Sequence, residues 1–179
     1  MLIANCSGAG KTSTLPFHFD CSVVVSAPAE DVFSRLDDPR LLAAHMRRSS
    51  WMMAGSRMSL ELDASQGRAV GAAIRMTGQV IGMALWLEEI VTERNPPRRK
   101  EWATTGTPRL LVIGHYRMGY EVTPQGQSSL LRVFIDYALP ETPAARWFGR
   151  VFADFYARWC TRRMASDAEE YFRIAGKSR

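Results

Sequence analysis

The sequence has 179 residues, of which 46% are hydrophobic and 23% are charged. This balance is typical of a soluble globular protein, and the length suits one domain with a sizeable core. The longest apolar run, Val80 to Leu87, is too short to cross a bilayer, and Met1 to Cys6 lacks the basic and apolar parts of a secretory signal. The 3 cysteines form no CxxC pair, which argues against disulfides and structural zinc. We expect a cytoplasmic protein.

The net charge of +5 raises the question of a nucleic-acid partner, because clustered Lys and Arg displace counterions from phosphates. The basic residues are dispersed over residues 47–48, 98–100, 146–163 and 177–179. No zinc-finger spacing or base-stacking motif accompanies them. We therefore interpret the charge as solvated surface and expect no nucleic-acid partner.

We expect residues 1–16 to be a flexible polar arm, separate from a domain predicted for residues 17–175. The arm contains Gly8-Ala9-Gly10-Lys11-Thr12, which is similar to the end of a phosphate-binding loop. That motif, GxxxxGK[ST], needs a glycine where this chain has Asn5, and a following helix that Pro16 blocks. We interpret the match as accidental.

The domain opens with a strand and two short helices. Phe17 to Val25 alternates apolar and polar side chains, which predicts a half-buried strand. Pro28, followed by acidic residues, marks a helix start, and Asp37-Asp38-Pro39 ends that helix. A second short helix is predicted over about Arg40 to Met46.

The middle of the chain alternates with period two, which predicts a series of strands. These segments are residues 57–63, 70–77, 85–93, 101–105, 115–122 and 131–139. Short turns at Asn95-Pro96-Pro97 and Pro124-Gln125-Gly126 imply that neighbouring strands are antiparallel, with one buried face.

One long helix closes the chain, from Thr142, which can cap its first turn, to Ala175 before Gly176. Apolar residues recur at steps of three and four and predict the face that covers the sheet. They are Phe148, Phe152, Phe155, Trp159, Cys160, Met164, Ala168 and Phe172. The predicted fold class is α+β: a curved antiparallel sheet of about seven strands around a long C-terminal helix, with two short helices after strand 1.

Three segments resemble the START-like (SRPBCC) superfamily, in its polyketide cyclase/dehydrase and lipid-transport branch. They are Val23 to Pro39 (VVVSAPAEDVFSRLDDP), Glu89 to Arg99 (EIVTERNPPRR) and Tyr116 to Pro124 (YRMGYEVTP). The resemblance covers about residues 17–172 and implies a helix-grip fold with a cavity between helix and sheet. It implies an apolar or aromatic small molecule as partner. None of the three segments is a catalytic signature.

Inward strand positions and the aromatic residues of the helix supply the candidate walls of such a cavity. The candidate ligand-binding residues are Trp51, Met76, Tyr116, Met118, Tyr120, Ile135, Tyr137, Phe152, Phe155, Tyr156 and Trp159. For each of them, simple filling of the core is the alternative.

Titratable side chains do not assemble into a catalytic set. His18, His45 and His115 lie on three separate elements, so we expect no metal and no cofactor. One of Glu88 and Glu89 should face inward, where an unpaired carboxylate would have a raised pKa. It would serve as a general acid or base, or be paired with a partner.

Three functions stay open at this point. The first is binding or transport of a lipid-like or polyketide-like molecule. The second is a cyclase or dehydratase in which a hydroxyl of Tyr116, Tyr120 or Tyr137 assists proton transfer, favoured by two polar groups within hydrogen-bond reach in the cavity. The third is an interaction module, similar to co-chaperone activator domains or docking on a membrane surface through Trp147 and Arg150. The oligomeric state is not predicted.

Overall fold

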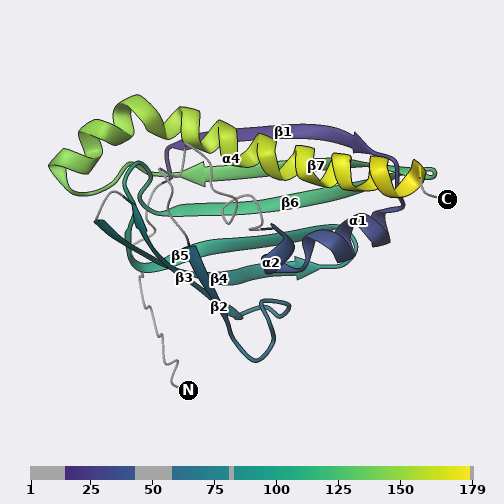
Figure 1. The fold of residues 1–179 in the computed structure, drawn as a ribbon, viewed down its shortest axis with the longest axis horizontal. Helices are drawn as coiled ribbons and strands as arrows, with labels where there is room; N and C mark the ends of the chain where they lie inside the picture. Colours follow the sequence, from purple (N-terminus) through teal and green to yellow (C-terminus); the bar gives the residue numbers. More distant parts are fainter. Residues whose placement is uncertain (1–14, 43–57, 81–82, 178–179) are drawn as a thin grey trace, which may run out of the picture.

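The computed structural model describes residues 15–42, 58–80 and 83–177 (Figure 1). Its elements are β1 (Phe17–Val25), α1 (Ala29–Leu36), α2 (Pro39–Leu42), β2 (Met58–Leu62), β3 (Ala73–Val80), β4 (Met83–Asn95), β5 (Arg99–Arg109), β6 (Tyr116–Gln125), β7 (Ser128–Tyr137) and α4 (Pro143–Lys177). The residues of the GAGKT segment, together with Trp51 and His45, lie outside the described ranges. The division of the chain at residue 16 stays a prediction.

The strands form one antiparallel sheet of 7 strands in the order β1-β7-β6-β5-β4-β3-β2. From β2 to β7 each strand pairs with its neighbour in sequence, as short turns require, and β1 then pairs with β7. Figure 1 shows α4 lying along β1 and β7, the two strands it contacts most. This arrangement confirms the predicted α+β helix-grip architecture.

Alternation along the strands places one set of side chains against the helices. Phe19 pairs with Ile135, and Ile135 pairs with Met118, so these three share the inner face. The main core lies between this face, α1 and α4. Its members include Val25, Val32, Phe33, Trp102, Met118, Tyr120, Leu131, Val133, Ile135, Tyr137, Ala153, Ala157 and Met164.

The covered face of α4 differs from the prediction in the first half of the helix. Phe148, Phe152 and Phe155 are 52%, 44% and 51% exposed, whereas Ala153 and Ala157 are buried at 2% and 0%. The small residues occupy the covered face because they let the helix approach β1 and β7 closely. In the second half the predicted residues Cys160, Met164 and Ala168 are buried, as expected.

The ends of several strands also differ from the sequence prediction. β3 begins at Ala73 and not at Val70, which is 64% exposed in the preceding turn. β5 continues to Arg109 because its second half pairs with β4 beyond the predicted end at Thr105. The pattern of apolar and polar residues marks neither end, so the pairing partner decides where each strand begins or ends.

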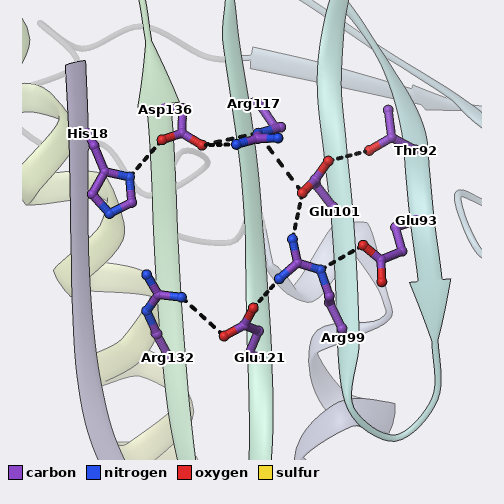
Figure 2. A network of polar contacts seen from close by, with 9 residues as sticks. All are labelled: His18, Thr92, Glu93, Arg99, Glu101, Arg117, Glu121, Arg132 and Asp136. Carbon is purple, nitrogen blue, oxygen red and sulfur yellow. Dashed lines mark hydrogen bonds and ion pairs between the residues drawn. The ribbon is translucent and has the colours of Figure 1, made fainter. Parts of the chain in front are cut away.

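The outer face of the sheet carries a network of charged side chains (Figure 2). Asp136 accepts from the Nη2 of Arg117 at 2.7 Å and contacts the Nδ1 of His18 at 2.6 Å. Arg99 joins Glu93, Glu101 and Glu121, and Arg132 joins Glu121 to Asp20. His18, Arg132 and Asp136 therefore lie on the outer face of the sheet, away from the main core.

A buried ion pair fixes the end of α1 to the sheet. The Lys100 ammonium, 1% exposed, donates to the Asp37 carboxylate and to its backbone carbonyl, both at 2.8 Å. Arg94 adds a contact of 2.8 Å from Nη2 to Oδ2 of Asp37. Burial alone raises the pKa of Asp37, but the hydrogen bonds from Arg94 and Lys100 outweigh it and hold the pKa below its usual range.

Candidate functional site

The inner face of β4 carries a buried carboxyl group, that of Glu89. Glu89 is 3% exposed and pairs in register with Ile74 on β3 and Thr104 on β5. Its neighbour Glu88 points the other way and accepts from the Nε of Arg75 at 2.6 Å. Irregularities in the β4–β5 pairing flank this stretch, between Trp86 and Glu88 and between Val91 and Glu93.

The Glu89 carboxyl is held by neutral donors. The Tyr116 hydroxyl donates a short hydrogen bond to it, and the side chain of Trp102 supplies another. Burial raises the pKa of Glu89 to about 7, although both hydrogen bonds act to lower it. Within the described part of the chain, no basic side chain contributes to this shift. Both protonation states are therefore populated near neutral pH.

Tyr116 is held in place by β5. Its backbone N–H donates to the Thr104 hydroxyl at 3.0 Å, and that hydroxyl also lies 3.3 Å from Nδ1 of His115. These contacts lie beyond the last pair of the β5–β6 ladder, Ala103 with Arg117. They anchor the backbone of the first residue of β6, whose phenol hydroxyl reaches Glu89.

The α4 helix brings two more polar side chains to the same place. Tyr156 and Cys160 are hydrogen-bonded to each other, and burial raises the pKa of the Cys160 thiol to about 12. The pKa of Tyr156 is raised by Cys160, by burial and by the charge of Glu89. We call Glu89, Trp102, Tyr116, Tyr156 and Cys160 the interior polar cluster.

Two residues of the cluster, Tyr116 and Tyr156, are only partly buried. Tyr116, Tyr156 and the adjacent Trp159 lie between sheet and helix, yet each keeps some accessible surface. The rings of Tyr156 and Trp159 are 6.1 Å apart. The nearly buried Glu89 carboxyl group therefore lies next to aromatic residues that keep some accessible surface.

The other predicted ligand residues are distributed differently. Met118, Tyr120, Ile135 and Tyr137 are buried in the main core, at 6%, 0%, 2% and 2% exposure. Met76 belongs to a second apolar group with Ile74, Leu87 and Val91. Phe152 and Phe155 face solvent, and Trp51 is outside the described residues. The structure therefore brings together Tyr116, Tyr156 and Trp159 from the predicted set.

Sequence reasoning left Trp102 and Cys160 out of the site, and left Glu89 undecided against Glu88. For Trp102 the missing information was register: Trp102 pairs with Met118 on one side and Val91 on the other, both on the inner face. For Cys160 the helix spacing pointed inward, and proximity to Tyr156 could have been inferred from their separation by four residues.

A separate cleft of about 790 Å³ lies where β1 begins and β7 ends, against the first half of α4. Phe17 and Tyr137 stack at 5.3 Å on its apolar side, and Arg146 and Arg150 contribute charge. Of the predicted ligand residues in the described ranges, only Tyr137 lines it.

The described residues contain no group of three His, Cys, Asp or Glu side chains placed to hold a metal ion. Among the described helices, none is long and apolar enough to cross a membrane.

Solved structures with a similar fold were found, at low sequence identity. Norcoclaurine synthase from Thalictrum flavum, in complex with dopamine and hydroxybenzaldehyde, has 19% identity and a TM-score of 0.59 over 87% of this chain and 85% of its own. The Zhui aromatase/cyclase from Streptomyces sp. R1128 has 15% identity and a TM-score of 0.59 over 89% and 98%. The protein TTHA0849 from Thermus thermophilus has 16% identity and a TM-score of 0.59 over 88% and 98%.

No curated protein sequence matches this chain at a significant level. The family model described as "Polyketide cyclase / dehydrase and lipid transport" matches residues 16–170, nearly the whole folded part. This range includes all three segments that carried the resemblance in the sequence. The chain therefore belongs to the polyketide cyclase / dehydrase and lipid transport family.

Proposed function

We propose that this protein binds an apolar or aromatic small molecule between α4 and the inner face of the sheet, beside the interior polar cluster. The observation that carries the proposal is the accessible aromatic surface of Tyr116, Tyr156 and Trp159 next to the Glu89 carboxyl. Family membership supports the same class of partner. Large ring faces bind apolar surface, and a few polar groups orient the ligand.

Glu89 and Tyr116 give the proposed site its polar end. A carboxyl with a pKa of about 7 can accept a hydrogen bond when ionised and donate one when protonated. A ligand with a hydroxyl or carbonyl at one end and an apolar body suits this arrangement. The aromatic side chains can stack on the apolar body of the ligand, and the interior polar cluster can form one hydrogen bond with its polar end.

Binding can be tested with a series of polycyclic phenols followed by fluorescence titration. Trp159→Ala removes an aromatic wall, and we expect it to raise Kd at least tenfold. Tyr171→Ala removes an aromatic side chain from the exposed side of the same helix and should leave Kd unchanged. If both variants bind like wild type, or if no phenol binds, the site is not between α4 and the sheet.

The hydrogen-bonded Glu89–Tyr116 pair favours a second candidate function, a cyclase or dehydratase. In such an enzyme the Glu89 carboxylate takes a proton from a carbon next to a carbonyl, and the Tyr116 hydroxyl stabilises the enolate oxygen. The resulting carbanion then attacks a second carbonyl of the same substrate molecule, and the protonated Glu89 returns its proton to the new alkoxide. A pKa of about 7 suits both proton transfers.

Turnover of a poly-β-ketone thioester tests this role. Glu89→Gln should lower kcat at least a hundredfold while the substrate still binds, because the base is lost and the shape is kept. Glu88→Gln changes the adjacent, outward carboxylate and should keep kcat. A rate that is equal in Glu89→Gln and wild type would show that Glu89 is not the base and leave only the binding function.

A further inference from the structure

The cleft of about 790 Å³ has a volume that is typical of sites for small molecules. It lies where β1 begins, β7 ends and α4 starts (Figure 1), and we call it the β1–α4 cleft. Leu139, Pro140 and Ala153 contribute apolar surface to it. Phe17 also lines it and is 42% exposed, although its ring stacks on Tyr137. An aromatic ring that keeps this much accessible surface can pack against a ligand.

Close packing holds the walls of the β1–α4 cleft in place. A Cβ on Gly149 would lie 2.9 Å from the Cδ of Pro140, so α4 rests directly on the chain that follows β7. The backbone N–H of Gly114 donates to the Ala138 carbonyl at 2.8 Å, and the N–H of Ala138 donates to the His115 carbonyl at 2.8 Å. These contacts fix both sides of the cleft before a ligand binds, which lowers the cost of binding.

The helix wall of the cleft carries two arginines without a partner. Arg146 and Arg150 are one turn apart, and neither forms an ion pair or a ring contact with a residue of the described ranges. Two like charges at this spacing repel each other. The other arginines of α4 each have an acidic or an aromatic partner. They are Arg158, Arg162, Arg163 and Arg173.

The remaining charged groups of the cleft do not neutralise both arginines. Asp154 is already paired with Arg158 at 2.8 Å, and Nδ1 of His18 contacts Asp136 at 2.6 Å. Glu141 is exposed and forms no ion pair within the described part of the chain. The two arginines and this glutamate leave one positive charge in excess. A singly charged anion would balance it.

We propose that the β1–α4 cleft binds a small carboxylic acid with an apolar body, its carboxylate held by Arg146 and Arg150 and its body packed against Phe17. A guanidinium group presents parallel N–H donors that match the two oxygens of a carboxylate. One carboxylate fits the excess charge better than a phosphate monoester, which carries about two negative charges at pH 7.

This site is separate from the interior polar cluster. Glu89, Tyr116 and Tyr156 do not line the cleft. An anionic ligand would be repelled by the Glu89 carboxylate, whereas a neutral phenol would not. The two proposed sites therefore take ligands of different charge, and either proposal can fail in an experiment without the other.

Calorimetric titration of the full chain with naphthoate, and with the neutral analogue naphthalenemethanol, tests the proposal. Arg146→Gln with Arg150→Gln should raise Kd for naphthoate at least tenfold at an unchanged Tm, because both side chains are exposed. The double variant should leave any affinity for the neutral alcohol unchanged. Arg163→Gln changes an arginine that pairs with Asp167 at 3.1 Å on the same helix, and should bind naphthoate like wild type.

Three outcomes would overturn the proposal. The wild type does not bind naphthoate, the double variant binds it like wild type, or Arg163→Gln weakens it equally. The last result would mean that naphthoate responds to the overall charge of the protein and not to the cleft.

The apolar wall can be tested separately. Phe17→Ala should raise Kd for naphthoate at least fivefold, because the ring that packs against the ligand is lost. Val24→Ala shortens another exposed side chain of β1 and should leave Kd unchanged. In amide NMR spectra of the wild type, naphthoate should shift the signals of Phe17 and Gly149 more than that of Glu89. Larger shifts at Glu89 would place the acid at the interior polar cluster and overturn the proposal.

Discussion

Glu89 is neutral in the folded protein over a pH range in which a free glutamate is ionised. Its pKa rises from 4.5 to about 7, so the unfolded chain loses the proton first as pH increases. Ionisation therefore favours unfolding between those two values, and the loss of stability is complete above the folded pKa. At 1.36 kcal/mol per pKa unit the cost is roughly 3 kcal/mol.

Glu89→Gln should remove this cost because the amide stays neutral. We expect its free energy of unfolding at pH 8 to exceed that of the wild type by about 1–3 kcal/mol, with little difference at pH 4. Urea titration at both pH values measures this. Glu88→Gln is the matched control, since its outward carboxylate is stabilised by Arg75 and should gain nothing. An equal gain in both variants would contradict a buried, neutral Glu89.

The two glutamates also mark the limit of prediction from sequence at the residue scale. Alternation predicts that one of Glu88 and Glu89 faces inward, and this is confirmed. Which one does so depends on the irregular pairing between β4 and β5, which shifts the register at Trp86/Glu88 and Val91/Glu93. Such shifts are set by the partner strand, so the sequence of β4 alone does not contain them.

At the scale of elements, α1 is held to the sheet by the Asp37–Lys100 pair. Removing the carboxylate leaves a buried ammonium without its countercharge, which is more costly than losing a surface pair. We expect Asp37→Ala to lower the free energy of unfolding by about 3–5 kcal/mol. The free energy of unfolding should also decrease as the pH is lowered below the ordinary pKa of Asp37. The reason is that the folded pKa of Asp37 is lowered, so protonation of the carboxylate favours the unfolded chain.

The neighbouring residue supplies the control for this prediction. Asp38 pairs with Arg68 at 3.2 Å near the surface and accepts from the backbone N–H of Arg40 at 2.9 Å, so Asp38→Ala should cost only about 1 kcal/mol. Chemical denaturation of both variants measures the difference. Equal losses would mean that the Asp37–Lys100 contact does not hold α1 in place.

The α4 helix shows what spacing predicts and what it leaves open. The helix ends at Lys177, two residues beyond the predicted Ala175, whereas its start follows from Thr142 and Pro143. Its covered side does not follow from the spacing, because aromatic residues occupy one side of the first turns and small residues the other. A Cβ on Gly149 would lie 2.9 Å from the carbonyl oxygen of Val112, so close approach requires the small side. Only the tertiary contact decides between the two sides.

At the scale of the whole molecule, the apolar interior has two parts of unequal size. The main core joins β1, β5, β6 and β7 to α1 and α4, and a smaller group joins β2, β3 and β4. β2 is a short edge strand of 5 residues, paired on one side only among the described strands. Strands with one partner and little buried surface open more easily than central ones.

Hydrogen exchange should therefore proceed in a defined order. Amides of β2 and β3 should exchange at least tenfold faster than those of β6 and β7, which have partners on both sides and face the main core. Exchange followed by mass spectrometry of peptides from each strand measures this. Equal rates for β2 and β6 would indicate a single cooperative opening and contradict the two-part interior.

The pairing of β1 with β7 has a consequence for synthesis on the ribosome. His18 and Asp136, which meet across that pair, are 118 residues apart in sequence. At 5–20 residues per second, roughly 5 to 25 seconds pass between translation of the two strands. During that interval the Val23-Val24-Val25 stretch has no strand to pair with and is open to association with other chains. Translation speed and chaperone supply should therefore affect the yield of this protein as directly as its stability does.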